Sequence, residues 1–144
     1  MTTIFMAEDD PLMSRMYERA FKANGYELQI AADGEEALSK LQKMETAPTI
    51  MLLDVMMPKV NGFDVLRGVK QNEKLKHVPV VMLTNLAGQA DAEKALTLGA
   101  VLYLVKSQYD PKQVVDKVKE ILSASSRGDE VPTVAVGVKD IPAA

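Results

Sequence analysis

Residues Thr49–Gly62 read TIMLLDVMMPKVNG and place a carboxylate at the end of an apolar run. Ile50 to Leu53 are all apolar, which is typical of a strand that is covered on both faces of a parallel sheet. Asp54 ends this run, and an ionised carboxylate that leaves water without a partner carries a large free-energy penalty. The sequence therefore predicts that Asp54 is solvated, is paired, or holds a ligand.

Short apolar runs alternate with amphipathic stretches along most of the chain, which indicates βα units and a parallel sheet. Continuous apolarity in the runs that end at Asp54 and Thr84 favours central strands, whereas alternation after Tyr26 favours an edge strand. We expect strands near Ile4–Ala7, Glu27–Ala31, Ile50–Asp54, Val78–Leu83 and Val101–Val105.

The amphipathic stretches have the apolar spacing of helices with one buried face. Asp10 and Pro11 suit an N-cap and a first helical residue, and Asn24-Gly25 suits the end of that helix. Asp33, with Glu36 three residues later, suits the cap of a second helix. Further helices are expected over Gly62–Lys70, over Ala90–Leu98, and from Asp110-Pro111 to Leu122.

The 144 residues are predicted to form one folded domain over 1–122 and a flexible C-terminal tail or linker over 123–144. The tail has no helical period, and its composition favours plain disorder. As an alternative, Val134, Val136 and Val138 alternate with small residues and suit a strand that pairs with a sheet edge on binding.

Composition and charge narrow the class of function. The chain has no cysteine, no apolar run of the roughly 18 residues that span a membrane, and no secretory signal pattern, so we expect a cytoplasmic protein without membrane attachment. Its 20 acidic and 17 basic residues give a net charge of −3 without a basic block. This charge pattern argues against direct binding of nucleic acid.

Polar residues stand at or just after the ends of four predicted strands. Parallel strands end at one edge of a sheet, where open α/β folds bind their ligands. The residues at this edge are the acidic group Glu8, Asp9 and Asp10, then Asp54, Thr84 and Lys106. Taken singly, each suits a helix cap, a solvated turn or a strand-end lysine, and for Asp10 the cap is the favoured interpretation.

Taken together, these residues suit phosphoryl transfer to a carboxylate. Neighbouring carboxylates 4 Å apart repel by about 4 kcal/mol at an effective dielectric constant near 20, so they require a positive partner. Mg²⁺ binds one or two carboxylates and keeps waters and phosphate oxygens as its other ligands. Asp54 supplies a nucleophile, while Lys106 and Thr84 supply a fixed charge and a hydroxyl donor for the phosphoryl oxygens.

The motifs MAEDDP, LLDVMMPKVNG, VVMLTN and YLVKS occur over Thr3–Leu122 in an order and spacing that resemble the receiver domains of two-component response regulators. The resemblance implies a doubly wound, flavodoxin-like α/β fold in which five helices flank a five-stranded parallel sheet of order 2-1-3-4-5. It implies that Asp54 is the phosphoacceptor. It also implies a Mg²⁺ site with Asp9 as a direct ligand, Glu8 acting through water, and the Met56 carbonyl as a further ligand.

The same resemblance implies a switch and a set of partners. Thr84 matches the switch hydroxyl, Lys106 the lysine of the site, and Tyr103 the aromatic that turns inward when the hydroxyl moves; the alternative for Tyr103 is an edge residue with its hydroxyl in water. A histidine kinase or phosphotransfer protein would donate the phosphoryl group, and a downstream protein would respond. We expect a monomer, or a dimer that forms on phosphorylation, which catalyses only its own phosphorylation and slow dephosphorylation.

Some residues near the predicted site depart from the family pattern. Ser107 replaces the usual proline after Lys106, so a trans peptide is expected because a cis bond there costs about 3 kcal/mol. Asn85 is larger than usual and would narrow the pocket. In the family that the chain resembles, the side chains two residues after the phosphoacceptor and two after the threonine overhang the phosphorus. Met56 and Leu86 occupy these positions here, and their apolar side chains cannot orient water, which predicts slow hydrolysis.

Three alternatives compete with a phosphorylated receiver. A haloacid-dehalogenase-type phosphohydrolase needs a second acid two residues after its nucleophile, where this chain has Met56. A receiver-fold scaffold that works without phosphorylation is disfavoured by the complete set of polar residues. A receiver fragment of a larger regulator stays open, although nothing after Leu122 is long enough for an output domain within these residues.

Overall fold

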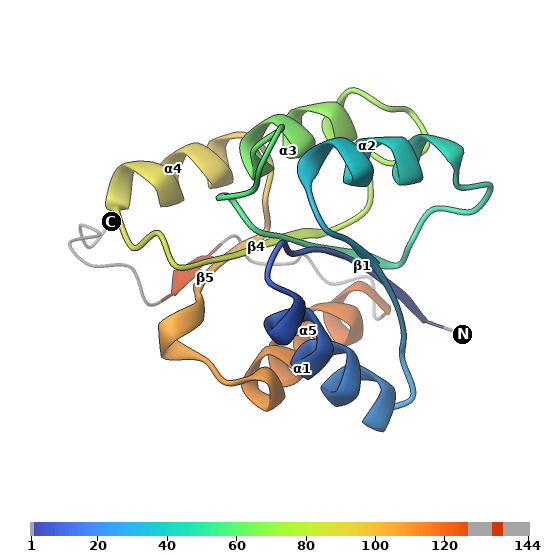
Figure 1. The fold of residues 1–144 in the computed structure, drawn as a ribbon, viewed down its shortest axis with the longest axis vertical. Coiled ribbons are helices and arrows are strands. Elements are labelled where there is room, and N and C mark those ends of the chain that lie inside the picture. Colours follow the sequence, from blue (N-terminus) through green and yellow to red (C-terminus); the bar gives the residue numbers. More distant parts are fainter. Residues whose placement is uncertain (1, 127–133, 137–144) are drawn as a thin grey trace.

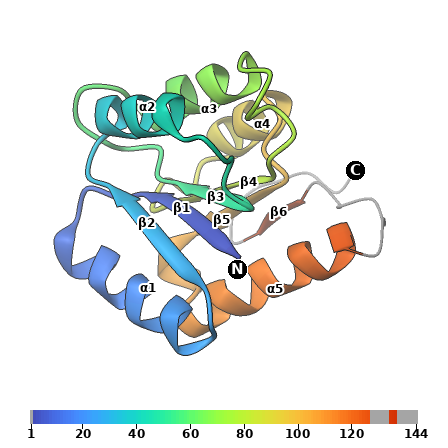
Figure 2. The same cartoon turned by 90° about the vertical axis from the view of Figure 1, so that its right-hand side faces the viewer.

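The computed structural model describes residues 2–126 and 134–136. One parallel sheet has the strand order β2-β1-β3-β4-β5-β6 (Figures 1 and 2). The order 2-1-3-4-5 of the first five strands confirms the predicted doubly wound fold. The strands are β1 (Thr3–Ala7), β2 (Glu27–Ala31), β3 (Ile50–Leu53), β4 (Val80–Thr84), β5 (Leu102–Val105) and β6 (Val134–Val136).

Helices cover both faces of this sheet. Figures 1 and 2 show α1 and α5 on one face and α2, α3 and α4 on the other. Asp10 caps the first helix by accepting the Leu12 amide at 2.9 Å, and Asp33 caps the second by accepting the Glu36 amide at 2.7 Å, so both predicted caps are confirmed. The helices are α1 (Pro11–Ala23), α2 (Gly34–Lys43), α3 (Gly62–Lys70), α4 (Gln89–Thr97) and α5 (Pro111–Ser126), with a short 3₁₀ helix at Lys106–Gln108.

Alternate strand residues enter two separate apolar layers, because successive side chains of a strand point to opposite faces. The layer beneath α2, α3 and α4, here the α2–α4 core, includes Phe5, Ala7, Met51, Leu53, Val80, Met82, Tyr103 and Val105. The layer beneath α1 and α5, here the α1–α5 core, includes Ile4, Met6, Ile50, Leu52, Val81, Leu83, Leu102 and Leu104. This division explains why β3 and the Val80–Leu83 part of β4 are apolar throughout, as predicted for central strands.

Several predicted limits shift by a few residues. The third strand ends at Leu53, so Asp54 lies just beyond it. The fourth strand begins at Val80 rather than Val78, because the Val78 amide instead donates to the Leu75 carbonyl at 3.0 Å in the preceding turn. The fifth helix continues to Ser126 rather than ending at Leu122, since a helix can continue beyond the apolar stripe that packs on the sheet.

The segment predicted as a tail contributes a sixth strand. β6 pairs in parallel with β5, with Tyr103 opposite Ala135, so the predicted disorder is wrong at residues 134–136. The alternative of a strand at a sheet edge holds for Val134 and Val136, although this strand pairs within the chain. Val138 and the rest of the predicted tail, residues 127–133 and 137–144, lie outside the described residues. The domain division at residue 122 therefore stays a prediction. In the described part of the chain, no helix combines the length and apolar character needed to cross a membrane.

A close backbone contact fixes the turn after β3. The Gly62 amide donates to the Val55 carbonyl at 2.9 Å, and a Cβ added to Gly62 would lie 2.1 Å from the Asp54 carbonyl oxygen. No side chain fits at that distance. Glycine therefore lets the start of α3 pack directly against the residue that the sequence predicts as the nucleophile.

We expect Gly62→Ala to lower the free energy of unfolding by about 2–3 kcal/mol, because two backbone segments must separate. Gly68→Ala is the matched control within the same helix. Its Cβ would meet only the flexible end of Leu38, at 2.8 Å, so its effect should stay within about 1 kcal/mol. Urea unfolding followed by circular dichroism measures both. Equal losses in the two variants would contradict the proposed backbone contact.

Candidate phosphoacceptor site

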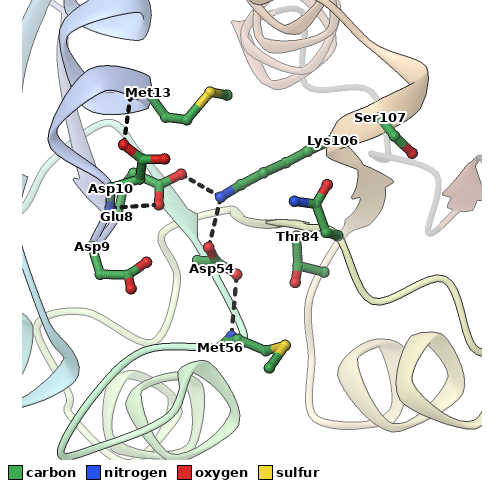
Figure 3. Close-up of a pocket in the computed structure, with 10 residues that line it drawn as sticks. Glu8, Asp9, Asp10, Met13, Asp54, Met56, Thr84, Lys106 and Ser107 are labelled. Carbon is green, nitrogen blue, oxygen red and sulfur yellow. Dashed lines mark hydrogen bonds and ion pairs between the residues drawn. The ribbon is translucent and has the colours of Figure 1, made fainter.

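The carboxyl ends of the strands bring the predicted polar residues together. Glu8 follows β1, Asp54 follows β3, Thr84 ends β4 and Lys106 follows β5. Figure 3 shows their side chains converging from these separate elements. They line one cavity of about 480 Å³ together with Asp9, Asp10, Met13, Met56, Asn85 and Ser107.

The Lys106 ammonium group bridges two buried carboxylates (Figure 3). Its Nζ donates to Glu8 Oε1 and, at 2.6 Å, to Asp54 Oδ2. The side chains of Lys106 and Asp54 are each only 8% exposed, and that of Glu8 is 2% exposed. Of the possibilities that the sequence left open for Asp54, the structure therefore shows a buried ion pair.

Backbone hydrogen bonds fix the position of Asp54 and hold the carboxylate oxygens of Asp54 and Glu8 that do not contact Lys106. The Asp54 amide donates to the Ala7 carbonyl at 3.1 Å, and Asp54 Oδ1 accepts the Met56 amide at 3.1 Å. Glu8 Oε2 accepts the Asp10 amide at 3.2 Å. Both acids are thus oriented by the ends of the sheet as well as by Lys106.

Burial and pairing act in opposite directions on these groups. Burial raises the pKa of Glu8, and this effect outweighs the opposing influence of Lys106. Burial alone would lower the pKa of Lys106, but its hydrogen bonds and charge interactions with Asp54 and Glu8 raise the pKa overall. Lys106 is therefore a fixed positive charge at neutral pH.

Three carboxylates have the spacing of a cation site. Single oxygens of Glu8, Asp9 and Asp54 all lie within 4.8 Å of one another. Glu8 and Asp54 are buried while Asp9 is exposed, so a bound ion would keep solvent ligands on one side. An all-oxygen, partly solvated set of this kind fits Mg²⁺. Asp10, in contrast, caps α1, which confirms the preferred interpretation of that residue.

The backbone of one residue links Thr84 to Tyr103. The Leu86 amide donates to Thr84 Oγ1 at 3.4 Å, and the Leu86 carbonyl accepts the Tyr103 hydroxyl at 2.8 Å. Thr84 and Tyr103 are both fully buried, and burial raises the pKa of Tyr103. Tyr103 is thus an interior residue here, and the alternative of an edge residue with a solvated hydroxyl is wrong for this structure.

The remaining predicted residues occupy different surroundings. Met56 and Asn85 line the cavity, whereas the Leu86 side chain is half-buried against the α2–α4 core. Ser107 also lines the cavity, and the described chain has no cis peptide bond, which confirms the expected trans geometry after Lys106. Sequence reasoning missed Met13 at this site. Its position three residues after Asp10, one helical turn further along, was the available signal.

The fold and this acidic site define a class of protein. The family model of the response regulator receiver domain matches residues 4–119, and the chain belongs to this family. Receiver domains are signalling modules of two-component systems and bind Mg²⁺ at their acidic site.

Individual relatives agree with this assignment. The transcriptional regulatory protein CpxR of Klebsiella pneumoniae is 32% identical over 137 residues, which cover 95% of this chain and 56% of CpxR. The chemotaxis response regulator CheY4 of Vibrio cholerae is 28% identical with a TM-score of 0.76, over 83% of this chain and 98% of CheY4. The phosphorylated cyanobacterial phytochrome response regulator RcpA is 27% identical with a TM-score of 0.76, over 86% of this chain and 95% of RcpA. The chain spans about half the length of the curated relatives it matches.

We expect Lys106→Met to lower the free energy of unfolding by about 3–5 kcal/mol at neutral pH, because two buried carboxylates lose their counter-charge. Without Lys106, the pKa of Glu8 should rise still further above its ordinary value. A group with a raised pKa in the folded state favours folding as it is protonated, so the deficit should shrink as the pH falls.

Urea unfolding of the variant and the unaltered chain at about pH 7 and about pH 5 tests this expectation. Lys22→Met is the control, since Lys22 forms only an exposed pair with Glu18 at 3.9 Å. A deficit that is equal at both pH values would contradict the role of Lys106 as the counter-charge.

Proposed function

We propose that this chain accepts a phosphoryl group on Asp54 from a histidine kinase or phosphotransfer protein, with Mg²⁺ as cofactor, and that phosphorylation switches its binding to a protein partner. The observation that carries this proposal is the placement of Asp54. Its carboxylate stands at the end of a buried strand, against Lys106 and beside the acidic cluster. A nucleophile held this firmly loses little freedom when it reacts.

The transfer reaction forms one bond and breaks one. A carboxylate oxygen of Asp54 attacks phosphorus, and the bond from phosphorus to the donor breaks, so the donor nitrogen or oxygen keeps the electron pair. Lys106 lies at hydrogen-bond distance from Asp54 and can turn to a phosphoryl oxygen, while the Thr84 hydroxyl lines the same cavity. Glu8, Asp9 and Asp54, with the Met56 carbonyl as a further ligand, would hold Mg²⁺, which would neutralise the negative charge that develops on the phosphoryl oxygens.

The switch uses the link from Thr84 through Leu86 to Tyr103. If the Thr84 hydroxyl turns to a phosphoryl oxygen, it releases the Leu86 amide, and the Leu86 carbonyl holds the Tyr103 hydroxyl. Through this link, phosphorylation would change how Tyr103 packs between β5 and α4. Two discrete arrangements of this link would give a partner two different surfaces.

The proposal also includes the location, the oligomeric state and the partners of the chain. The chain acts in the cytoplasm as a monomer that pairs on phosphorylation at most, without direct contact to nucleic acid or membrane, and it catalyses only its own phosphorylation and slow dephosphorylation. Because the curated relatives are about twice as long, a receiver fragment of a larger regulator is the second candidate. A scaffold without phosphorylation is the third.

Acetyl phosphate with Mg²⁺, followed by intact-mass measurement, tests the phosphoacceptor. The unaltered chain should gain one phosphoryl group, and Asp54→Asn should gain none because it lacks the nucleophile. Asp64→Asn is the control, since Asp64 forms only an exposed pair with Arg67 on α3. Labelling of the Asp54 variant equal to that of the control would contradict the assignment, and no labelling of any chain would favour the scaffold.

The lifetime of the phosphorylated form gives a second test. Met56 is 60% exposed at the cavity and cannot orient an attacking water, so Met56→Asn should speed decay on the order of tenfold. Leu86→Glu is measured as a separate variant. It should also speed decay only if its side chain leaves the α2–α4 core. Decay is followed by intact mass in excess Mg²⁺ after removal of the phosphodonor. Unchanged decay in both variants would show that other groups set the lifetime.

A further inference from the structure

Tyr17 carries a buried hydroxyl that no described residue satisfies. The residue is fully buried in the α1–α5 core, and its hydroxyl has no hydrogen-bond partner in the described part of the chain. A buried polar group without a partner is destabilising, and such groups are rare in folded proteins. Phenylalanine would fill this position without that cost, so the hydroxyl calls for an explanation.

The strand pattern places the charged groups of the site on the same side of the sheet as Tyr17. Glu8, Asp54 and Lys106 continue the strand rows of Met6, Leu52 and Leu104, all of which belong to the α1–α5 core. Thr84 instead continues the row of Met82 in the α2–α4 core, which also contains Tyr103. Each face of the sheet therefore has one buried tyrosine below the site, and only the Tyr103 hydroxyl is paired, through Leu86.

The helix also directs Tyr17 toward the cavity. Met13 lines the cavity, and Tyr17 lies four residues later on the same face of α1. Long side chains on a helix lean toward its N-terminus, which here is the end at the acidic site. The charges that act on the Tyr17 hydroxyl are those of Lys106, Glu8 and Asp54. Burial, more than these charges, raises the pKa of Tyr17 to about 12, so the hydroxyl keeps its proton and can donate it.

Phosphorylation would leave one buried acceptor without its donor. Glu8 Oε1 is held by Lys106, while Glu8 Oε2 already accepts the Asp10 amide. If Lys106 turns to a phosphoryl oxygen on Asp54, Oε1 loses this donor and keeps only its interaction, direct or through water, with the cation proposed for this site. A carboxylate oxygen has two lone pairs, so the loss of the Lys106 donor leaves one of them unsatisfied even beside a cation. The unpaired hydroxyl of Tyr17 lies on the same face of the sheet.

We propose that Tyr17 is a positioning residue whose hydroxyl donates to Glu8 when Lys106 turns from Glu8 to the phosphorylated Asp54. This inference rests on the proposed phosphorylation of Asp54. The hydroxyl would keep Glu8 oriented toward the cation site in the phosphorylated state and would lack a partner in the unphosphorylated state. Its contribution therefore differs between the two states, which distinguishes it from a residue that only fills space.

Tyr17→Phe tests the inference, with beryllium fluoride and Mg²⁺ as a stable phosphoryl mimic. Without the mimic, the variant should melt at the same temperature as the unaltered chain or higher, because an unpaired buried hydroxyl has been removed. The apparent affinity for the mimic, taken from the rise in melting temperature, should fall about fivefold or more, because one hydrogen bond of the bound state is lost. Tyr26→Phe is the control, since Tyr26 packs against Phe21 at the start of β2.

The outcomes separate this inference from the proposed function. If the unaltered chain neither gains a phosphoryl group from acetyl phosphate nor responds to the mimic, the proposed function fails. If the unaltered chain responds and Tyr17→Phe responds equally, only the role of Tyr17 fails.

A measurement on the unaltered chain covers the case of a variant that does not fold. The sequence has four tyrosines, so ¹³Cζ-tyrosine labelling gives four signals, and phenylalanine variants at Tyr26, Tyr103 and Tyr109 assign Tyr17 by elimination. The Tyr17 signal should shift when the mimic and Mg²⁺ are added, while Tyr26 stays fixed. A Tyr17 signal that does not move overturns the inference.

Discussion

The ion pair from Lys106 to both Glu8 and Asp54 is the interaction on which the site depends. Two carboxylates at this depth are tolerated because one ammonium group bridges them and backbone amides hold their other oxygens. The charges nevertheless do not balance. Glu8, Asp9 and Asp54 contribute three negative charges and Lys106 one positive charge, which leaves −2 at the cluster. A divalent cation matches this residual charge, so the same arrangement that stabilises the folded chain also favours Mg²⁺.

The sheet separates the charged groups of the site from Thr84 and Tyr103. Glu8, Asp54 and Lys106 continue strand rows of the α1–α5 core, whereas Thr84 and Tyr103 belong to the side of the α2–α4 core. Successive residues of a strand point to opposite faces, so β5 delivers Tyr103 to one side while Lys106, just after it, follows the other. A phosphoryl group at Asp54 would therefore meet donors from both faces at once. Under the proposed phosphorylation of Asp54, one modification at a strand end would therefore act on the packing of both sides of the sheet.

The sequence predicted the features that have strong local signals. The apolar run before Asp54, the cap at Asp10 and the glycine after Asn24 each act over a few residues, and the structure confirms all three. Backbone roles were not predictable, because every residue carries the same amide and carbonyl, and so the link through Leu86 was missed. Tyr17 has the spacing of an ordinary apolar helix residue, which concealed its position below the charged groups. The alternation of Val134 and Val136 indicated a strand only as an alternative to disorder, because the three-residue strand β6 depends on pairing with a distant part of the chain.

The two edges of the sheet differ, and this difference affects where a partner could bind. β2 forms one edge and exposes Glu27 and Gln29, polar side chains that discourage pairing with another strand. β5 would form the other edge, but β6 covers it and also contacts α4 (Figure 2). The backbone groups along this edge of β5 are thus already engaged by β6. If Thr84 and Tyr103 form a switch as proposed, a partner that responds to it would have to recognise side chains of α4 and α5, or displace β6 and lose its strand hydrogen bonds.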